Sequence, residues 1–131
     1  MELETHKQAF EERKETIFKW ALEVRGLENS QHIVGDNASR AITELLSAYL
    51  HQQKKVEVGY QLNHAWFKSE KVRERLPEFN SKEEIVSQMI YLEILCEKLS
   101  YGSPKPLVMT EEVINLFKSL EKKLKELLLW N

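Results

Sequence analysis

Residues 81–106, SKEEIVSQMIYLEILCEKLSYGSPKP, contain the beginning, the apolar face and the end of one helix. Ser81 followed by Glu84 has the spacing of a capping box at a helix N-terminus. Apolar residues then recur every three or four positions, as they do on one face of an α-helix. They are Ile85, Val86, Met89, Ile90, Leu92, Leu95, Cys96 and Leu99. Because Gly102 and two prolines follow, the pattern predicts a helix that ends near Tyr101.

Three other segments repeat this helical spacing, and most of the few glycines and prolines lie between the segments. Their apolar residues are Phe10, Ile17, Phe18, Ala21 and Leu22; Ala38, Ala41, Ile42, Leu45, Leu46 and Tyr49; and Val113, Ile114, Phe117, Leu120, Leu124, Leu127 and Leu128. No window alternates with a period of two, so we predict no strand. The expected fold is all-α, an antiparallel four-helix bundle that forms a single domain over residues 1–131.

The ends of these helices follow from glycines and capping residues. The first helix should close at Gly26. The second begins either with Asp36 as its N-cap or near Gln31, with Gly35 inside the helix. Thr110, followed by two glutamates, is expected to cap the fourth.

The connection between the second and third helices, roughly thirty residues from 52 to 80, is too long for a simple turn. It contains too many apolar residues for a free linker, and we expect a short helix over residues 62–76.

Composition excludes several classes of protein. Nineteen basic and 21 acidic residues give a net charge of −2, which argues against a general binder of nucleic acid or anionic membranes. A single cysteine allows no intrachain disulfide, and the residues after Met1 are charged rather than those of a signal peptide. No apolar run reaches the length of about 18–20 residues that spans a bilayer. We therefore expect a cytoplasmic protein.

Metal and covalent chemistry have little support in the sequence. The four histidines are scattered, and no pair of Glu-x-x-His motifs is present to hold two metal ions. We therefore expect no metal and no cofactor. Cys96 lies on an apolar helix face, where a thiol is normally an inert core residue.

Residues 63–71, NHAWFKSEK, combine two aromatic rings, an imidazole and cationic groups, and Arg73 follows. Aromatic rings with cations are typical of sites that grip single-stranded nucleic acid or a nucleotide. The alternative is that the aromatic rings close the edge of the bundle while the cations form a solvated face. Similarly, Lys98 and Tyr101 at the end of the third helix need no role beyond completing its last turn.

The sequence resembles the HEPN superfamily of helical bundles. The stretch SRAITELLSAYL at 39–50 is similar to the second helix of that family, and LNHAWFKS at 62–69 to its His-bearing connection. The third helix also ends in a Leu-x-aromatic-Gly pattern. Nuclease members carry Arg-x4–6-His at this helix end, and two copies face each other across a homodimer. In this sequence Cys96 stands at the arginine and Tyr101 at the histidine, so the resemblance implies a non-catalytic member.

The preferred hypothesis is therefore a homodimeric, HEPN-like protein that binds RNA, a nucleotide or a protein partner. The resemblance further implies a nucleotidyltransferase-type partner in a toxin–antitoxin or defence setting. The candidate ligand-binding residues are His64, Lys68, Arg73, Lys98 and Tyr101.

Two alternatives remain: a metal-independent ribonuclease that uses His64 with Arg73 or Arg75, and a plain helical interaction module. The apolar residues 127–130 are a predicted dimer contact.

Overall fold

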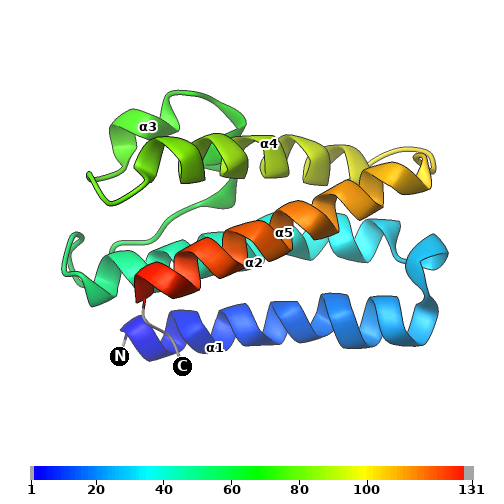
Figure 1. Cartoon of the computed structure of the whole chain (residues 1–131), viewed down its shortest axis with the longest axis horizontal. Helices are drawn as coiled ribbons and strands as arrows, with labels where there is room; N and C mark the ends of the chain where they lie inside the picture. The colour runs from blue at the N-terminus through cyan, green and yellow to red at the C-terminus, as the bar shows by residue number, and fades with distance from the viewer. Residues whose placement is uncertain (1, 129–131) are drawn as a thin grey trace.

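The computed structural model describes residues 2–128 and has an all-α fold, with no strand in that range. The helices are α1 (Glu2–Glu15), η1 (Thr16–Arg25), η2 (Leu27–Asn29), α2 (Gln31–Gln52), η3 (His64–Lys68), α3 (Val72–Arg75), α4 (Lys82–Ser100) and α5 (Leu107–Leu128). Helix α1 continues directly into η1, whose turns are wider. The four main helices run alternately in opposite directions (Figure 1). The predicted antiparallel four-helix bundle is confirmed.

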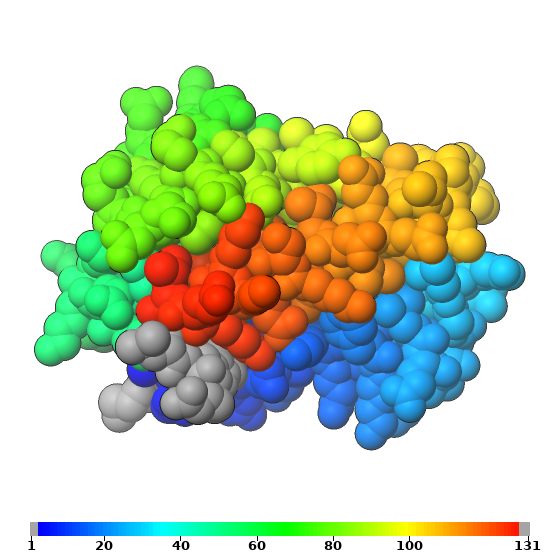
Figure 2. Space-filling view, in the orientation of Figure 1, coloured from blue at the N-terminus to red at the C-terminus, as the bar shows by residue number. Residues whose placement is uncertain are grey.

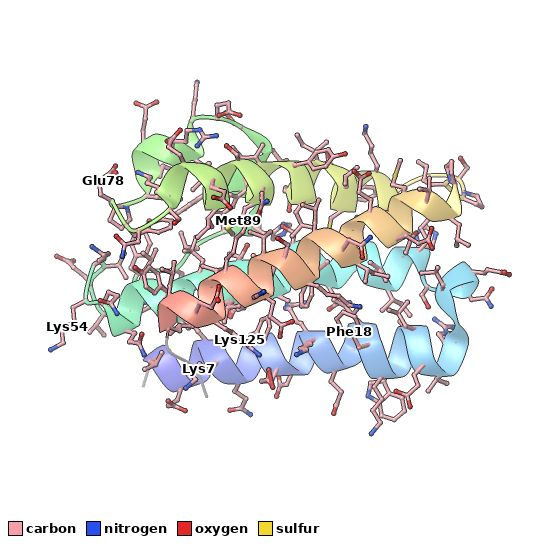
Figure 3. All side chains as sticks on the ribbon, in the orientation of Figure 1. Lys7, Phe18, Lys54, Glu78, Met89 and Lys125 are labelled. Atoms are coloured by element: carbon pink, nitrogen blue, oxygen red, sulfur yellow. The ribbon has the colours of Figure 1, made fainter. Side chains whose placement is uncertain are left out.

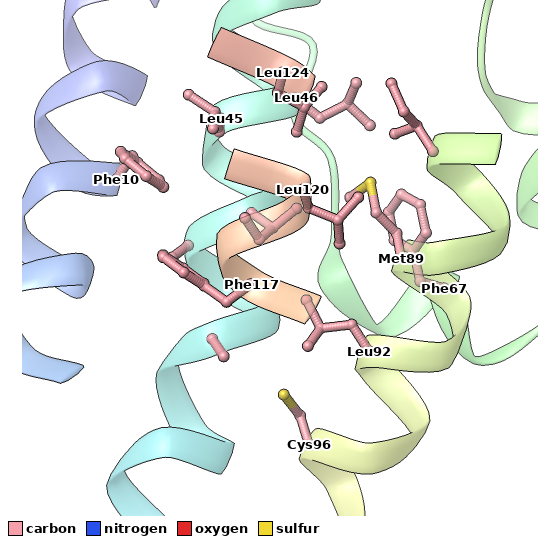
Figure 4. Packing of buried hydrophobic residues seen from close by; sticks show 14 of the residues in the cluster. Phe10, Leu45, Leu46, Phe67, Met89, Leu92, Cys96, Phe117, Leu120 and Leu124 are labelled. Atoms are coloured by element: carbon pink, nitrogen blue, oxygen red, sulfur yellow. The ribbon is translucent and has the colours of Figure 1, made fainter. Parts of the chain in front are cut away.

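Helix α2 is the centre of the bundle and packs against α1, α4 and α5. In Figure 2, α5 fills the space between α1 and α4 on the visible face. The core contains the predicted apolar stripes, and Figure 4 shows Leu45 and Leu46 of α2 near Leu120 and Leu124 of α5. Figure 3 shows Lys54 and Glu78 pointing outward and Met89 pointing inward. Burying each large apolar side chain in this way contributes about 1.5–3 kcal/mol to the free energy of unfolding.

Helix α4 begins at Lys82 with Ser81 as its N-cap, as predicted, but the predicted capping bond is absent, the predicted start of the fourth helix is wrong, and one open boundary is resolved. Ser81 has a left-handed backbone (φ 63°) and its side chain makes no capping bond, so the capping box does not form. Helix α5 begins at Leu107, directly after Pro106, which leaves Thr110 buried inside the helix rather than at its cap. Helix α2 begins at Gln31, so Gly35 lies inside it.

The connection does contain short helical structure, as expected, but as two segments, η3 and α3, rather than one helix over residues 62–76. The Asn63 side chain accepts a hydrogen bond from the backbone N–H of Ala65 at 2.8 Å and begins η3. Ser69 is extended and ends it, and α3 follows after a turn. Phe67 and Val72 are buried and anchor one turn each. The connection is therefore fixed to the bundle at two points.

The C-terminal dimer contact predicted for residues 127–130 lies partly outside the described residues, which end at 128. Leu128 is buried in the core, and Leu127 is half-buried against it. Within residues 2–128, no helix is long and apolar enough to cross a membrane.

Gly35 sets the distance between α2 and the end of α4. A Cβ atom at this position would lie 2.8 Å from the Cβ of Leu99, 2.9 Å from the carbonyl oxygen of Cys96 and 2.9 Å from the backbone nitrogen of Ser100. Two of these atoms belong to the backbone, which cannot turn away as a flexible side chain can. The close approach of the two helices therefore requires glycine here.

Replacing Gly35 with alanine is expected to lower the free energy of unfolding by about 1–3 kcal/mol, because the added methyl group overpacks the interface. At an ordinary helix position the same change raises stability by about 0.5–1 kcal/mol. Urea unfolding followed by circular dichroism measures the sign. A Gly35→Ala variant more stable than the native chain would contradict the close approach.

Candidate functional site

Two hollows meet beside α2 and share Arg40 and His64. We call the larger one, of about 360 Å³, the arginine pocket, because Arg13 and Arg40 line it together with Trp66. The smaller one, of about 60 Å³, is the carboxylate pocket. Asp36, Glu93 and Glu97 line it with Lys68 and Tyr101. Since Arg40 and His64 line both, the two pockets are neighbours, and we treat them together as one candidate site.

A histidine–carboxylate pair forms one side of the carboxylate pocket. The Nδ1 atom of His64 lies 3.0 Å from Oε1 of Glu93. The cap at Asn63 places His64 at the first position of η3, facing α4. Glu93 is only 3% exposed, and its one ion pair with a described residue is that with His64. A carboxylate buried so deeply is costly unless it is paired, so the His64 contact is essential to it.

A second pair lies one turn further along both helices. Lys68 stands four residues after His64, and its ammonium lies 2.5 Å from Oε2 of Glu97, four residues after Glu93. Both side chains are about half exposed, which limits the energy of the pair. The hydrogen bond and the charge of Glu97 raise the pKa of Lys68 above its usual value. Two parallel contacts thus align η3 with α4.

On the side of the site formed by α1 and α2, the charged side chains are paired less completely. Asp36 accepts a hydrogen bond from the Ser100 hydroxyl at 2.7 Å, and Arg13 donates one to the Asn37 side chain at 3.0 Å. Glu44, the acid of the arginine pocket, is paired with His6 at 3.2 Å. Arg40 is exposed and makes no hydrogen bond or ion pair with the described residues. Among the described residues, it is the one arginine or lysine lining these pockets that makes no hydrogen bond or ion pair.

The structure brings together three of the five predicted site residues: His64, Lys68 and Tyr101 all line the carboxylate pocket. Tyr101 is 71% exposed at its rim. Lys98 lines neither pocket. Arg73 also lies apart, bound to Glu70 at 2.7 Å and Ser87 at 2.7 Å.

Sequence reasoning missed Arg13, Arg40 and Glu93. Glu93 had a local signal, since it falls between buried positions of an apolar helix face. The arginines had none, because only the fold brings them to His64.

Cys96 faces the carboxylate pocket but is 3% exposed. Figure 4 shows it projecting from α4 toward α2. Burial, together with the charges of Glu93 and Asp36, raises the pKa of its thiol to about 12, although a hydrogen bond with the Ser39 backbone acts in the opposite direction. The thiol is therefore protonated at neutral pH and is a poor nucleophile. Among residues 2–128, no three His, Cys, Asp or Glu side chains are grouped so that they could hold a metal ion.

Comparison of the chain with protein-family models, curated proteins and solved structures gives no match. The resemblance to the HEPN superfamily therefore stays a prediction, carried by the residues quoted for it.

The thiol of Cys96 should react with a disulfide reagent such as DTNB at least about 100-fold more slowly in the folded chain than in denaturant, because folding buries it and suppresses the thiolate. Absorbance of the released thiol measures the rate, and no other cysteine contributes. Equal rates in the two states would show that the thiol is accessible.

Proposed function

We propose that this chain binds a phosphate-bearing ligand in the site formed by the two pockets, and that the ligand is single-stranded RNA or a nucleotide. The observation that carries the proposal is the exposed guanidinium of Arg40, which makes no hydrogen bond or ion pair with the described residues and which lines both pockets together with His64. Arginine is well suited to phosphate because its planar fork donates two parallel hydrogen bonds.

Charge and aromatic surface in the arginine pocket support this ligand. Arg13 and Arg40 line the pocket against one acid, Glu44, which His6 already contacts. Trp66 adds an aromatic surface to the same pocket. Its ring is held in place by Arg75, whose guanidinium lies 4.6 Å from the ring centroid, and by the edge of Tyr60. Cations beside a fixed aromatic ring match the phosphate and base of a nucleotide.

The wider proposal follows the family resemblance. A non-catalytic HEPN-like protein would act as a homodimer and would associate with a nucleotidyltransferase-type partner in a toxin–antitoxin or defence setting. The thiol of Cys96 and the phenol of Tyr101 support the non-catalytic reading, because neither replaces a guanidinium and an imidazole at neutral pH.

Binding is tested with a fluorescent single-stranded RNA of about twelve nucleotides, a length within the range that single-strand binders cover. Fluorescence anisotropy at about 50 and about 200 mM salt should show weaker binding at the higher salt, since phosphate contacts release counterions. Arg40→Gln should weaken binding about five- to tenfold and reduce the salt dependence, because one charged phosphate contact is lost.

Lys122→Gln is the matched control, because Lys122 is an exposed cation of α5 that lines neither pocket. It should bind RNA like the native chain. If both variants lost RNA affinity equally, the RNA would be held by positive charges spread over the surface rather than at a specific site. Absent or salt-insensitive binding would instead favour the plain interaction module.

The His64–Glu93 pair favours a second candidate, a metal-independent ribonuclease. A carboxylate that holds one imidazole nitrogen leaves the other free to take a proton from a ribose hydroxyl. Arg40 would then face the phosphate. Arg73 and Arg75 are less suitable than the sequence suggested, because neither lines a pocket that contains His64.

Incubating the native chain and His64→Ala with structured and single-stranded RNA in EDTA tests this candidate. If the chain is an enzyme, the native protein cleaves and His64→Ala loses at least about 100-fold in rate, the usual contribution of a general base. Gel electrophoresis resolves the products. If the native chain leaves the RNA intact, the ribonuclease candidate is rejected, and RNA binding without cleavage is the remaining proposal.

A further inference from the structure

Glu93 is a buried carboxylate on a helix face whose other buried residues are mostly apolar. It lies on the buried face of α4, between Met89 and Cys96, and is 3% exposed. Replacing a buried ion pair with apolar residues of similar volume is often neutral or stabilising. Glu93 lies at the wall of a pocket and is paired there with His64. Its presence is therefore better explained by its effect on the His64 ring.

The contact determines which nitrogen of His64 faces the site. An ionised Glu93 can only accept, and the proton of the 3.0 Å contact then belongs to Nδ1 of His64. In the neutral ring the lone pair then belongs to Nε2. No described residue bonds to Nε2, and the side chain is 27% exposed and lines both pockets. The free nitrogen is thus a hydrogen-bond acceptor on a side chain that lines the same two pockets as Arg40.

We infer that Glu93 is a positioning residue that holds His64 with Nε2 available as an acceptor, and that the site selects ligands with a hydroxyl donor next to their phosphate. The inference rests on the proposed function for its ligand. A ribose 2′-hydroxyl beside a phosphate has this chemistry, and a deoxyribose lacks it. Arg40 would bind the phosphate, and His64 would accept the hydroxyl proton in a hydrogen bond.

The first test is nitrogen-15 NMR of the histidine rings in the full chain at about pH 8, above the ordinary imidazole pKa of about 6.5. His64→Gln identifies the His64 signals. The native chain should show His64 protonated at Nδ1 and bare at Nε2, and Glu93→Leu should lose this preference. The matched control is Glu121→Leu, the same change at a paired carboxylate of α5 that lines neither pocket, and it should leave the His64 signals unchanged. An unchanged tautomer in Glu93→Leu would overturn the positioning role.

The second test compares RNA and DNA oligonucleotides of one sequence by anisotropy. The native chain should bind RNA about five- to tenfold more tightly, the effect of one hydrogen bond. Glu93→Leu should lose this preference, because leucine cannot accept a hydrogen bond from His64, whereas Glu121→Leu, outside both pockets, should keep it. Urea unfolding of each variant separates lost binding from lost fold.

The outcomes separate this inference from the proposed function. If the native chain binds RNA and DNA equally, the proposed phosphate site stands and the hydroxyl selection fails. If it binds neither, the proposed function fails, and NMR alone decides whether Glu93 positions His64.

Discussion

The close approach of α2 to the end of α4 at Gly35 is the constraint on which the site depends. No side chain separates the helices there, so the backbone of α2 lies directly against Cys96, Leu99 and Ser100. Residues one turn further along α2 are thereby brought to α4. The Ser100 hydroxyl reaches Asp36, and Ser39 and Arg40 line the same small pocket as Glu93 and Glu97. A wider spacing would separate the two walls of this pocket.

The opposite side of the site comes from the connection, and it is held in a different way. Phe67 is fully buried and anchors η3 against the bundle, which leaves His64 and Lys68 on the side that faces α4. Their partners are Glu93 and Glu97, with the same four-residue spacing. The deeper pair matters more for stability. Removing the partner of a buried carboxylate destabilises a protein far more than removing the partner of a carboxylate at the surface. Apolar packing thus sets the position of η3, and the two ion pairs fix its register on α4.

The fold could be read from the sequence because apolar spacing reports directly which face of a helix is buried. Local capping rules were less reliable. Ser81 has a left-handed backbone and makes no capping bond, and α5 begins at Leu107, which leaves Thr110 inside the helix. The site was predicted only in part. His64, Lys68 and Tyr101 stood out because aromatic and basic residues were clustered or followed by a glycine. Arg40 stands on a helix more than twenty residues before His64, and nothing in its own neighbourhood distinguishes it from any solvated arginine.

The contrast between Arg40 and Arg73 shows why residue type alone could not identify the site. Both are arginines near the bundle surface, but Arg73 has its guanidinium committed to Glu70, Glu83 and Ser87. Such a group must break existing contacts before it can bind a phosphate. Arg40 has no such contacts among the described residues, so a ligand would replace only water. An arginine can bind a phosphate readily only if its guanidinium is not already held by other side chains. This is why the proposed ligand site is placed at Arg40, where the two pockets adjoin, rather than at Arg73.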